Sequence, residues 1–262
     1  MNILRSKDGK NSIAYNKLII DKSQAPCFIF SHGYMSDMNG TKALYIEEYC
    51  KKKSYDYIRF DNFGCGNSSG DFINQTISDW TKGLIMVVNA LSNGPVFLIG
   101  SSLGAWISFL AALELPKKIL GIISISAGFD FTEELIWQTL KHEDKETLQN
   151  GEIYHACGTH AECTTKYPIK MSLIKDGRKN LILSGSKIDI SCPVHLIHGM
   201  QDKDVPYTIS TRAAEKLVSS NVVLKLIKDG AHNLSRPSDL DIICHSIDEI
   251  VKSTVWPHSN LT

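Results

Sequence analysis

The chain has 262 residues, of which 28 are Lys or Arg and 28 are Asp or Glu, so its formal net charge is zero. A neutral chain offers no cationic surface for nucleic acid or an anionic membrane, and no apolar run approaches the ~20 residues of a membrane span. Seven cysteines are scattered in no framework of pairs, which favours a reducing compartment. The length suits one large α/β domain over residues 1–262.

Strand and helix patterns alternate along most of the chain. A turn at 7–10 between two extended segments, the second at 12–20, predicts an opening hairpin. Apolar runs rich in β-branched residues predict further strands at 27–30, 55–60, 95–99, 119–125, 192–198 and 222–227. Amphipathic spacing predicts helices at 42–53, 79–91, 105–112, 210–218 and 240–251. This alternation predicts a mostly parallel sheet with helices on both faces.

Residues 128–191 interrupt the alternation. We expect them to form a lid inserted over the carboxyl-end edge of the sheet, where ligands bind in open α/β folds. The segment contains a charged helix over 133–149, followed by Cys/His-rich and Gly/Ser-rich stretches.

Four residues of this lid carry donor atoms of the type that binds zinc, namely His155, Cys157, His160 and Cys163. They lack the paired two-residue cysteine knuckles of a structural zinc site. A polar lid helix or loop is therefore the favoured interpretation, and we expect no metal and no cofactor.

The sequence Gly100-Ser101-Ser102-Leu103-Gly104 follows a predicted buried strand and passes directly into a predicted helix. Glycines at both ends allow a tight strand-to-helix turn that exposes the serine hydroxyl at the helix N-terminus. The five-residue pattern is weak alone, because Gly and Ser are common. Its position between a strand and a helix predicts that Ser102 is a nucleophile.

A nucleophilic serine needs a histidine base and an acid that orients the base, in the chain order Ser, Asp or Glu, His. Asp202 and His232 each follow a late predicted strand, so they are the expected acid and base. Asp204 is the alternative acid, but the spacing His-Gly-x-x-Asp favours Asp202. Asp229 is interpreted as a solvated loop charge.

Two backbone N–H groups must hold the oxyanion of an acyl-transfer intermediate. One is expected from Leu103, immediately after the nucleophile. The other is expected from the loop after the strand at 27–30, with Tyr34 favoured and Met35 as the alternative. His32 is expected to order this loop without titrating in catalysis.

Two further histidines, His195 and His198, lie inside or at the end of a predicted strand. They are interpreted as buried, hydrogen-bonded residues without a chemical role. Apolar residues of the loop and lid are candidates to line an acyl channel, with ordinary packing as the alternative: Met35, Phe129, Phe131 and Trp137.

Several short motifs accompany these residues, namely His32-Gly33-Tyr34, Arg59-Phe60-Asp61 followed by Gly64-x-Gly66-x-Ser68, and His198-Gly199-x-x-Asp202. With the serine motif and His232, they resemble the α/β-hydrolase superfamily over nearly the whole chain. More narrowly, the stretches 33–36, 38–44, 100–106 and 196–200 resemble the family of α/β-hydrolase domain-containing protein ten. This resemblance implies an α/β-hydrolase fold and a mitochondrial palmitoyl-protein thioesterase that also cleaves acyl glucuronides. It places Ser102, Asp202 and His232 on the family's triad, whereas residues 151–167 differ from the family's lid.

The expected function is a serine hydrolase that cleaves an acyl thioester or ester, with S-palmitoyl cysteine on proteins favoured by the resemblance. The alternatives are a carboxylesterase or acyl-glucuronide esterase and, outside enzymes, a ligand-binding protein of the same fold without catalysis. The expected partner is an S-acylated protein or a small acyl ester. The resemblance implies the mitochondrion, but residues 1–10 lack the features of a transit peptide, so the cytoplasm is the alternative.

Overall fold

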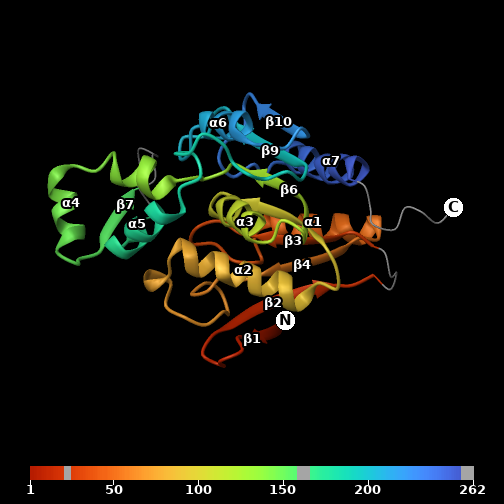
Figure 1. Ribbon diagram of the computed structural model, residues 1–262, viewed down its shortest axis with the longest axis horizontal. Helices are drawn as coiled ribbons and strands as arrows, with labels where there is room; N and C mark the ends of the chain where they lie inside the picture. Colours follow the sequence, from red (N-terminus) through yellow and green to blue (C-terminus); the bar gives the residue numbers. More distant parts are fainter. Residues whose placement is uncertain (21–24, 158–165, 255–262) are drawn as a thin grey trace.

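An eight-stranded sheet forms the centre of the molecule (Figure 1). The computed structural model describes residues 1–20, 25–157 and 166–254. Across the sheet the strand order is β1-β2-β4-β3-β5-β6-β9-β10. The strands are β1 (Asn2–Arg5), β2 (Ser12–Leu18), β3 (Cys27–Ser31), β4 (Asp56–Phe60), β5 (Val96–Ser101), β6 (Ile119–Ile125), β9 (Val194–Gly199) and β10 (Val222–Ile227). The pairs β1–β2 and β2–β4 are antiparallel and all other neighbouring pairs are parallel, which confirms the opening hairpin and the mostly parallel sheet.

Helices pack on both faces of this sheet, as predicted. They are α1 (Thr41–Lys53), α2 (Ile77–Leu91), α3 (Leu103–Glu114), α6 (Thr208–Lys216) and α7 (Pro237–Ser253). Side chains of α2, α3 and α6 join one apolar core, and those of α1 and α7 join a second core. In the described part of the chain, no helix combines the length and the apolar character needed to cross a bilayer.

Helix α2 begins two residues before its predicted start because Thr76 and Asp79 form a capping box. The Thr76 hydroxyl accepts a hydrogen bond from the Asp79 N–H at 3.3 Å, and the Asp79 carboxylate accepts one from the Thr76 N–H at 3.1 Å. Two N–H groups that lack helical partners are satisfied in this way.

The segment expected to form a lid, residues 128–191, lies between β6 and β9, and we keep the name lid for it. Its elements are a π-helical turn (Thr132–Trp137), α4 (His142–Gln149), β7 (Tyr154–Cys157), β8 (Lys166–Ile169), α5 (Met171–Gly177) and a 3₁₀ turn (Arg178–Asn180). β7 and β8 form a separate antiparallel pair. Figure 1 shows α4, β7 and α5 grouped beside one end of the main sheet. The expectation of a helix or loop at 155–163 is therefore wrong at 155–157, which belong to β7, and residues 158–163 lie outside the described residues.

The predicted single helix over 133–149 is also wrong, because the chain forms two shorter helical pieces there. Between them Leu140 turns inward and is only 9% exposed. Lys141 then adopts an extended conformation (φ −67°, ψ 164°) that starts α4. Glu143 and Asp144 in the first turn favour this new start through the helix dipole.

Asp130 joins the two ends of the lid, and we call its contact with Ile182 and Leu183 the lid clasp. The buried Asp130 carboxylate accepts hydrogen bonds from the N–H groups of Ile182 at 2.9 Å and Leu183 at 2.8 Å. Burial raises the pKa of this carboxyl to about 6. Nearby, Glu134 accepts two hydrogen bonds from Arg212 of α6, at 2.7 and 2.8 Å. The lid is therefore fixed to the rest of the molecule at its base.

Tyr34 makes a second attachment to the lid. Its hydroxyl donates a hydrogen bond to the Pro168 carbonyl of β8 at 2.7 Å. Its ring packs edge-on against Phe72, Trp80 and Phe131, with ring centroids 4.8 to 5.8 Å apart. One residue of the loop after β3 thus contacts both the core beside the main sheet and the lid.

Candidate active site

Ser102 lies on the turn between β5 and α3, in a backbone conformation that strains residues other than glycine (φ +53°, ψ −114°). The flanking glycines make this turn sterically possible. A Cβ at Gly104 would lie 2.1 Å from the Ser31 carbonyl oxygen, and one at Gly100 would lie 2.5 Å from the backbone of Ala105. The Gly-x-Ser-x-Gly pattern therefore fits the local backbone, and the serine stands at the start of α3.

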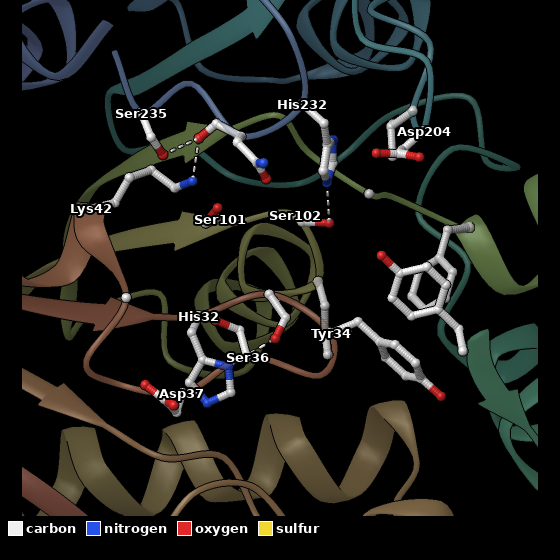
Figure 2. A pocket seen from close by; sticks show the side chains of 18 of the residues that line it. His32, Tyr34, Ser36, Asp37, Lys42, Ser101, Ser102, Asp204, His232 and Ser235 are labelled. Carbon is white, nitrogen blue, oxygen red and sulfur yellow. Dashed lines mark hydrogen bonds between the residues drawn. The ribbon is translucent and has the colours of Figure 1, made fainter. Parts of the chain in front are cut away.

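His232 lies between Ser102 and Asp202. Its Nε2 is 3.2 Å from the Ser102 Oγ, and its Nδ1 is 2.7 Å from the Asp202 Oδ2 (Figure 2 shows the first contact). Because Nδ1 faces a carboxylate, it carries the ring proton and leaves Nε2 as the acceptor for the serine proton. The Asp202 carboxylate is fully buried, whereas the His232 imidazole is 22% exposed on the cavity side. The three residues named from the sequence are thus in contact, in an order suited to proton transfer.

The Asp202 carboxylate accepts four hydrogen bonds. Its Oδ1 accepts from the N–H groups of Asp204 at 2.9 Å and Val205 at 2.8 Å. Its Oδ2 accepts from His232 and from the Nε2 of His198 at 3.0 Å. Burial by itself raises the pKa of Asp202, but these hydrogen bonds outweigh burial and hold the pKa well below its usual range. Asp202 is therefore ionised and fixed in orientation.

His198 contacts this acid directly, although the sequence reasoning gave it no chemical role. Its Nε2 lies 3.0 Å from both the Asp202 carboxylate and the Val205 carbonyl, and its Nδ1 lies 2.7 Å from the Ser210 hydroxyl of α6. The ring is fully buried and hydrogen-bonded, in agreement with the expectation. It ties the acid to β9 and α6, and its position four residues before Asp202 is the sequence signal that indicates this contact.

The loop after β3 is held in place by His32. Its Nε2 accepts a hydrogen bond from the Asn62 N–H at 3.0 Å, so its Nδ1 is the donor to the Gly33 carbonyl at 2.8 Å. Burial lowers the pKa of His32, which keeps it neutral. Leu103 is the first residue of α3, so its N–H has no acceptor within the helix. Tyr34 lines the cavity beside Ser102, on the side from which a second donor is expected.

Asp204, the alternative acid, also lines the cavity. The oxygen that contacts the His232 Nδ1 belongs to Asp202, which favours Asp202 over Asp204 as the acid, as the sequence spacing predicts. Donor atoms of Asp202, Asp204 and His232 lie within 4.8 Å of one another, a spacing that a metal ion could use. Two of these three residues are already hydrogen-bonded to each other, as serine hydrolysis requires.

Two further expectations need correction. Asp229 is exposed, but both of its oxygens accept hydrogen bonds from Arg236, at 2.7 and 3.1 Å, so it is ion-paired as well as solvated. His195 is buried on β9, but in the described residues its Nδ1 has no hydrogen-bond partner. The nearest ionic group, Glu249, lies 3.7 Å away, and burial lowers the pKa of His195.

The lid residues considered as zinc ligands are incompletely described. His160 and Cys163 lie outside the described residues, and His155 and Cys157 belong to β7. The zinc interpretation therefore stays a hypothesis from the sequence alone.

A cavity of about 600 Å³ opens at Ser102, and its walls differ in character. The lid contributes an apolar lobe formed by Phe131, Leu135, Ile136, Ala156, Tyr167 and Ile169. The loop after β3, the start of α1 and the loop after β10 contribute a polar lobe formed by Ser36, Asp37, Gly40, Thr41, Lys42, Asn233 and Ser235. Figure 2 shows Lys42 and Ser235 on one side of Ser102, and Tyr34 and Asp204 on the other.

Of the four residues considered as the lining of an acyl channel, only Phe131 lines the cavity in the described residues. Phe129 is completely buried in the core, and the Trp137 ring faces two cationic side chains at 5.4 and 4.7 Å. Met35 is 46% exposed with a φ of +52° and lies outside the cavity wall. The sequence reasoning also missed Lys42, whose signal is a cation in the first turn of a helix, where the dipole disfavours it.

Comparison with known proteins gives consistent matches. Residues 26–155 match the family described as alpha/beta hydrolase fold. The protein named palmitoyl-protein thioesterase ABHD10, mitochondrial, from Bos taurus is 35% identical over 240 residues, which cover 92% of this chain and 76% of that protein. The solved structure of alpha/beta hydrolase domain-containing protein 10 from mouse superimposes with a TM-score of 0.87 at 32% identity, covering 96% of this chain and 98% of that one. A structure from Agrobacterium vitis S4 has a TM-score of 0.88 at 33% identity, covering 96% and 97% of the two chains.

Proposed function

The chain belongs to the α/β-hydrolase family and is a serine hydrolase of that fold, and from this premise we propose that it removes fatty acyl groups from thioesters, with S-palmitoyl cysteine on proteins as the substrate class. The observation that carries the proposal is the pair of contacts made by His232, 3.2 Å to the Ser102 Oγ and 2.7 Å to the Asp202 Oδ2. These contacts lie beside a cavity whose lid side is apolar.

In the acylation step, His232 Nε2 takes the proton of the Ser102 hydroxyl while Oγ attacks the acyl carbon. The negative charge that forms on the acyl oxygen is held by the N–H groups of Leu103 and Tyr34. The tetrahedral intermediate collapses, the carbon–sulfur bond breaks, and His232 gives its proton to the leaving thiolate. The acyl group remains on Ser102 as an ester.

In the deacylation step, water takes the place of the thiol. His232 accepts a proton from water, the resulting hydroxide attacks the acyl-enzyme carbonyl, and the fatty acid leaves as Ser102 regains its proton. Asp202 is ionised throughout and stabilises the imidazolium that forms in each half-reaction. No step needs a metal ion or an organic cofactor.

The apolar lobe supports a fatty acyl group as the transferred part. Each methylene that leaves water for an apolar wall contributes about 0.8 kcal/mol, so a longer chain gains binding energy for as long as the lobe accommodates it. The same oxyanion donors serve oxygen esters, and the printed name of the bovine relative, a palmitoyl-protein thioesterase, is what favours the thioester. That name also includes the word mitochondrial, and we propose the mitochondrion as the location of this protein.

The test compares an S-palmitoyl peptide with a short-chain aryl ester, using wild type, Ser102→Ala and a fluorophosphonate probe. Ser102→Ala is expected to lose about 10⁴-fold or more in turnover and all labelling. Wild type is expected to prefer the palmitoyl thioester. Turnover of only the aryl ester would make the protein a carboxylesterase, and absence of both turnover and labelling would overturn catalysis itself.

A further inference from the structure

Lys42 places an ammonium group in the polar lobe, close to the proposed base. It lies in the first turn of α1, and its Nζ donates a hydrogen bond to the carbonyl oxygen of Asn233, the residue after His232. Both Lys42 and Asn233 line the cavity. Figure 2 shows the Lys42 side chain reaching toward the loop that carries His232.

The position of this ammonium is unfavourable in the free protein for two reasons. A cation in the first turn of a helix opposes the helix dipole, and α1 has no acidic residue in that turn to offset it. Burial removes water from the ammonium and lowers the pKa of Lys42 to about 8. Unfavourable placements of this kind tend to occur at functional sites.

Nearby carboxylates do not neutralise Lys42. Among the described residues, none forms an ion pair with its Nζ. Asp239 of α7, the carboxylate that acts on Lys42 from a distance, accepts hydrogen bonds from Arg236 at 2.8 and 2.9 Å. Asp37, in the loop after β3, lines the same lobe as Lys42, but its carboxylate accepts a hydrogen bond from the Asn39 N–H of its own loop at 2.7 Å.

An ammonium has three N–H donors, and one of them serves Asn233. The others remain for a group that enters the polar lobe. With the acyl chain against the lid and the carbonyl carbon at Ser102, the leaving group of the substrate extends into this polar lobe, on the other side of the serine.

We propose that Lys42 binds an anionic group, a carboxylate or a phosphate, carried by the leaving group of the substrate a few bonds from the scissile thioester or ester. The preferred substrates are then fatty acyl derivatives of acidic thiols or alcohols. Lys42 acts as a specificity residue, and the proton of the leaving group still comes from His232. This inference rests on the proposed function, since it assigns the part of the substrate that the acyl lobe does not hold.

The test uses three thioesters with the same decanoyl group, made from 2-mercaptoethanol, 3-mercaptopropionate and 2-mercaptoethyl phosphate. Wild type is expected to favour an anionic thioester over the neutral one by about tenfold or more in kcat/KM, mainly through KM, because the neutral thioester cannot form a charge-assisted hydrogen bond with Lys42. Comparison of the 3-mercaptopropionate and 2-mercaptoethyl phosphate thioesters shows whether the site prefers a carboxylate or a phosphate.

Lys42→Gln keeps an N–H donor near Asn233 but removes the charge, and Lys42→Arg keeps the charge. The preference for anionic leaving groups is expected to fall to about one in Lys42→Gln and to persist in Lys42→Arg. An equal loss on all three thioesters in Lys42→Gln, with the preference unchanged, would mean that Lys42 only holds the His232 loop and would overturn the proposal.

The pH dependence of the preference for anionic leaving groups gives a second test. This test does not require the Lys42→Gln variant to fold. Lys42 is charged below about pH 8 and neutral above it, so the wild-type preference is expected to fade between pH 7 and pH 9.5. Lys42→Arg is expected to keep its preference over that range. Asp37, Asp239 and His232 also face this region, but both enzymes share them, so the difference between the enzymes reports residue 42. Parallel profiles in the two enzymes would contradict the inference.

The failure of this inference is separable from the failure of the proposed function. Calorimetric binding of 3-(methylthio)propionate, a product-like carboxylate, requires no turnover. Binding to wild type with a loss of tenfold or more in Lys42→Gln supports the anion site even if every thioester is inert. Equal binding by both proteins, or none by wild type, would remove the anion site while leaving hydrolysis at Ser102 intact.

Discussion

The hydrolase core and the lid form opposite walls of one cavity, but they hold their residues in place by different means. Ser102 follows β5 directly, and Asp202 and His232 lie in the turns that follow β9 and β10. The lid has no strand in the main sheet, and separate long-range contacts hold it, among them the Asp130 clasp and the hydroxyl of Tyr34. Arg212 also contacts Glu134, and Ser78 of α2 donates two hydrogen bonds to Asp176 of α5. A residue at the end of a sheet strand is fixed by local geometry, whereas a lid residue depends on a few long-range contacts.

Replacing the acid tests the core side of this comparison and should have the largest effect. Asp202→Asn keeps the shape but removes the charge that fixes the His232 tautomer, and it is expected to lower kcat/KM by about 10⁴-fold. Asp204→Asn is the matched control, expected to cost less than about tenfold, since the oxygen on the His232 Nδ1 belongs to Asp202. Steady-state kinetics on the short aryl ester measures both variants. Equal losses of kcat/KM in the two variants would contradict the assignment of Asp202 as the acid.

The lid clasp gives a pH-dependent effect on stability. The pKa of Asp130 is raised from 3.8 to about 6, so the folded state binds this proton more tightly than the unfolded state does. Stability from this group is therefore fully present below about pH 4 and is lost as pH rises through 6, by roughly 2–3 kcal/mol.

Asp130→Asn removes this titration while keeping a residue that tolerates the left-handed backbone found there (φ +54°). Urea unfolding of both proteins at pH 4 and pH 7 measures the change. The stability of wild type relative to the variant is expected to fall between the two pH values. Identical pH profiles would show that the lid base does not depend on the carboxyl.

The smallest expected effect concerns the second attachment of the lid. Tyr34→Phe keeps the ring packing but removes the hydrogen bond to the Pro168 carbonyl, a loss of ~1 kcal/mol. Activity on the palmitoyl thioester, which needs the lid wall, is expected to fall about threefold to tenfold, and activity on the short ester less. Tyr45→Phe is the control, because its hydroxyl binds Asp241 on the exposed surface at 3.0 Å. An equal loss on both substrates would mean that Tyr34 acts on the oxyanion loop and not through the lid.

The sequence predicts the core well because its signals are local. The apolar run of β5, the glycines around Ser102 and the spacing from His198 to Asp202 each specify a backbone feature within a few residues. The alternation of strands and helices then brings the strand ends together at one edge of a parallel sheet. The fold and the contacts among Ser102, Asp202 and His232 could be anticipated in this way.

The internal elements of the lid escape prediction because their signals are long-range. The break near Leu140 depends on an apolar side chain reaching the core, and the β7–β8 pair depends on Tyr154 meeting Ile169 across the chain. Nothing within either segment specifies these contacts. Lys42 was overlooked for a related reason, since a lysine in a polar helix is ordinarily a solvated charge, and only the fold places it against Asn233.

The lid clasp also bears on how proteins of this kind diversify. The Asp130 carboxylate contacts Ile182 and Leu183, so residues 131–181 form a loop whose two ends are held together. The entropy of closing such a loop grows only slowly with its length, so insertions in its exposed parts are tolerated, whereas Leu173, Ile174 and the contact between Ser78 and Asp176 tie α5 to the core. A lid grafted from another hydrolase between these two points would therefore need to keep the α5 contacts in order to redirect acyl preference without disturbing the sheet.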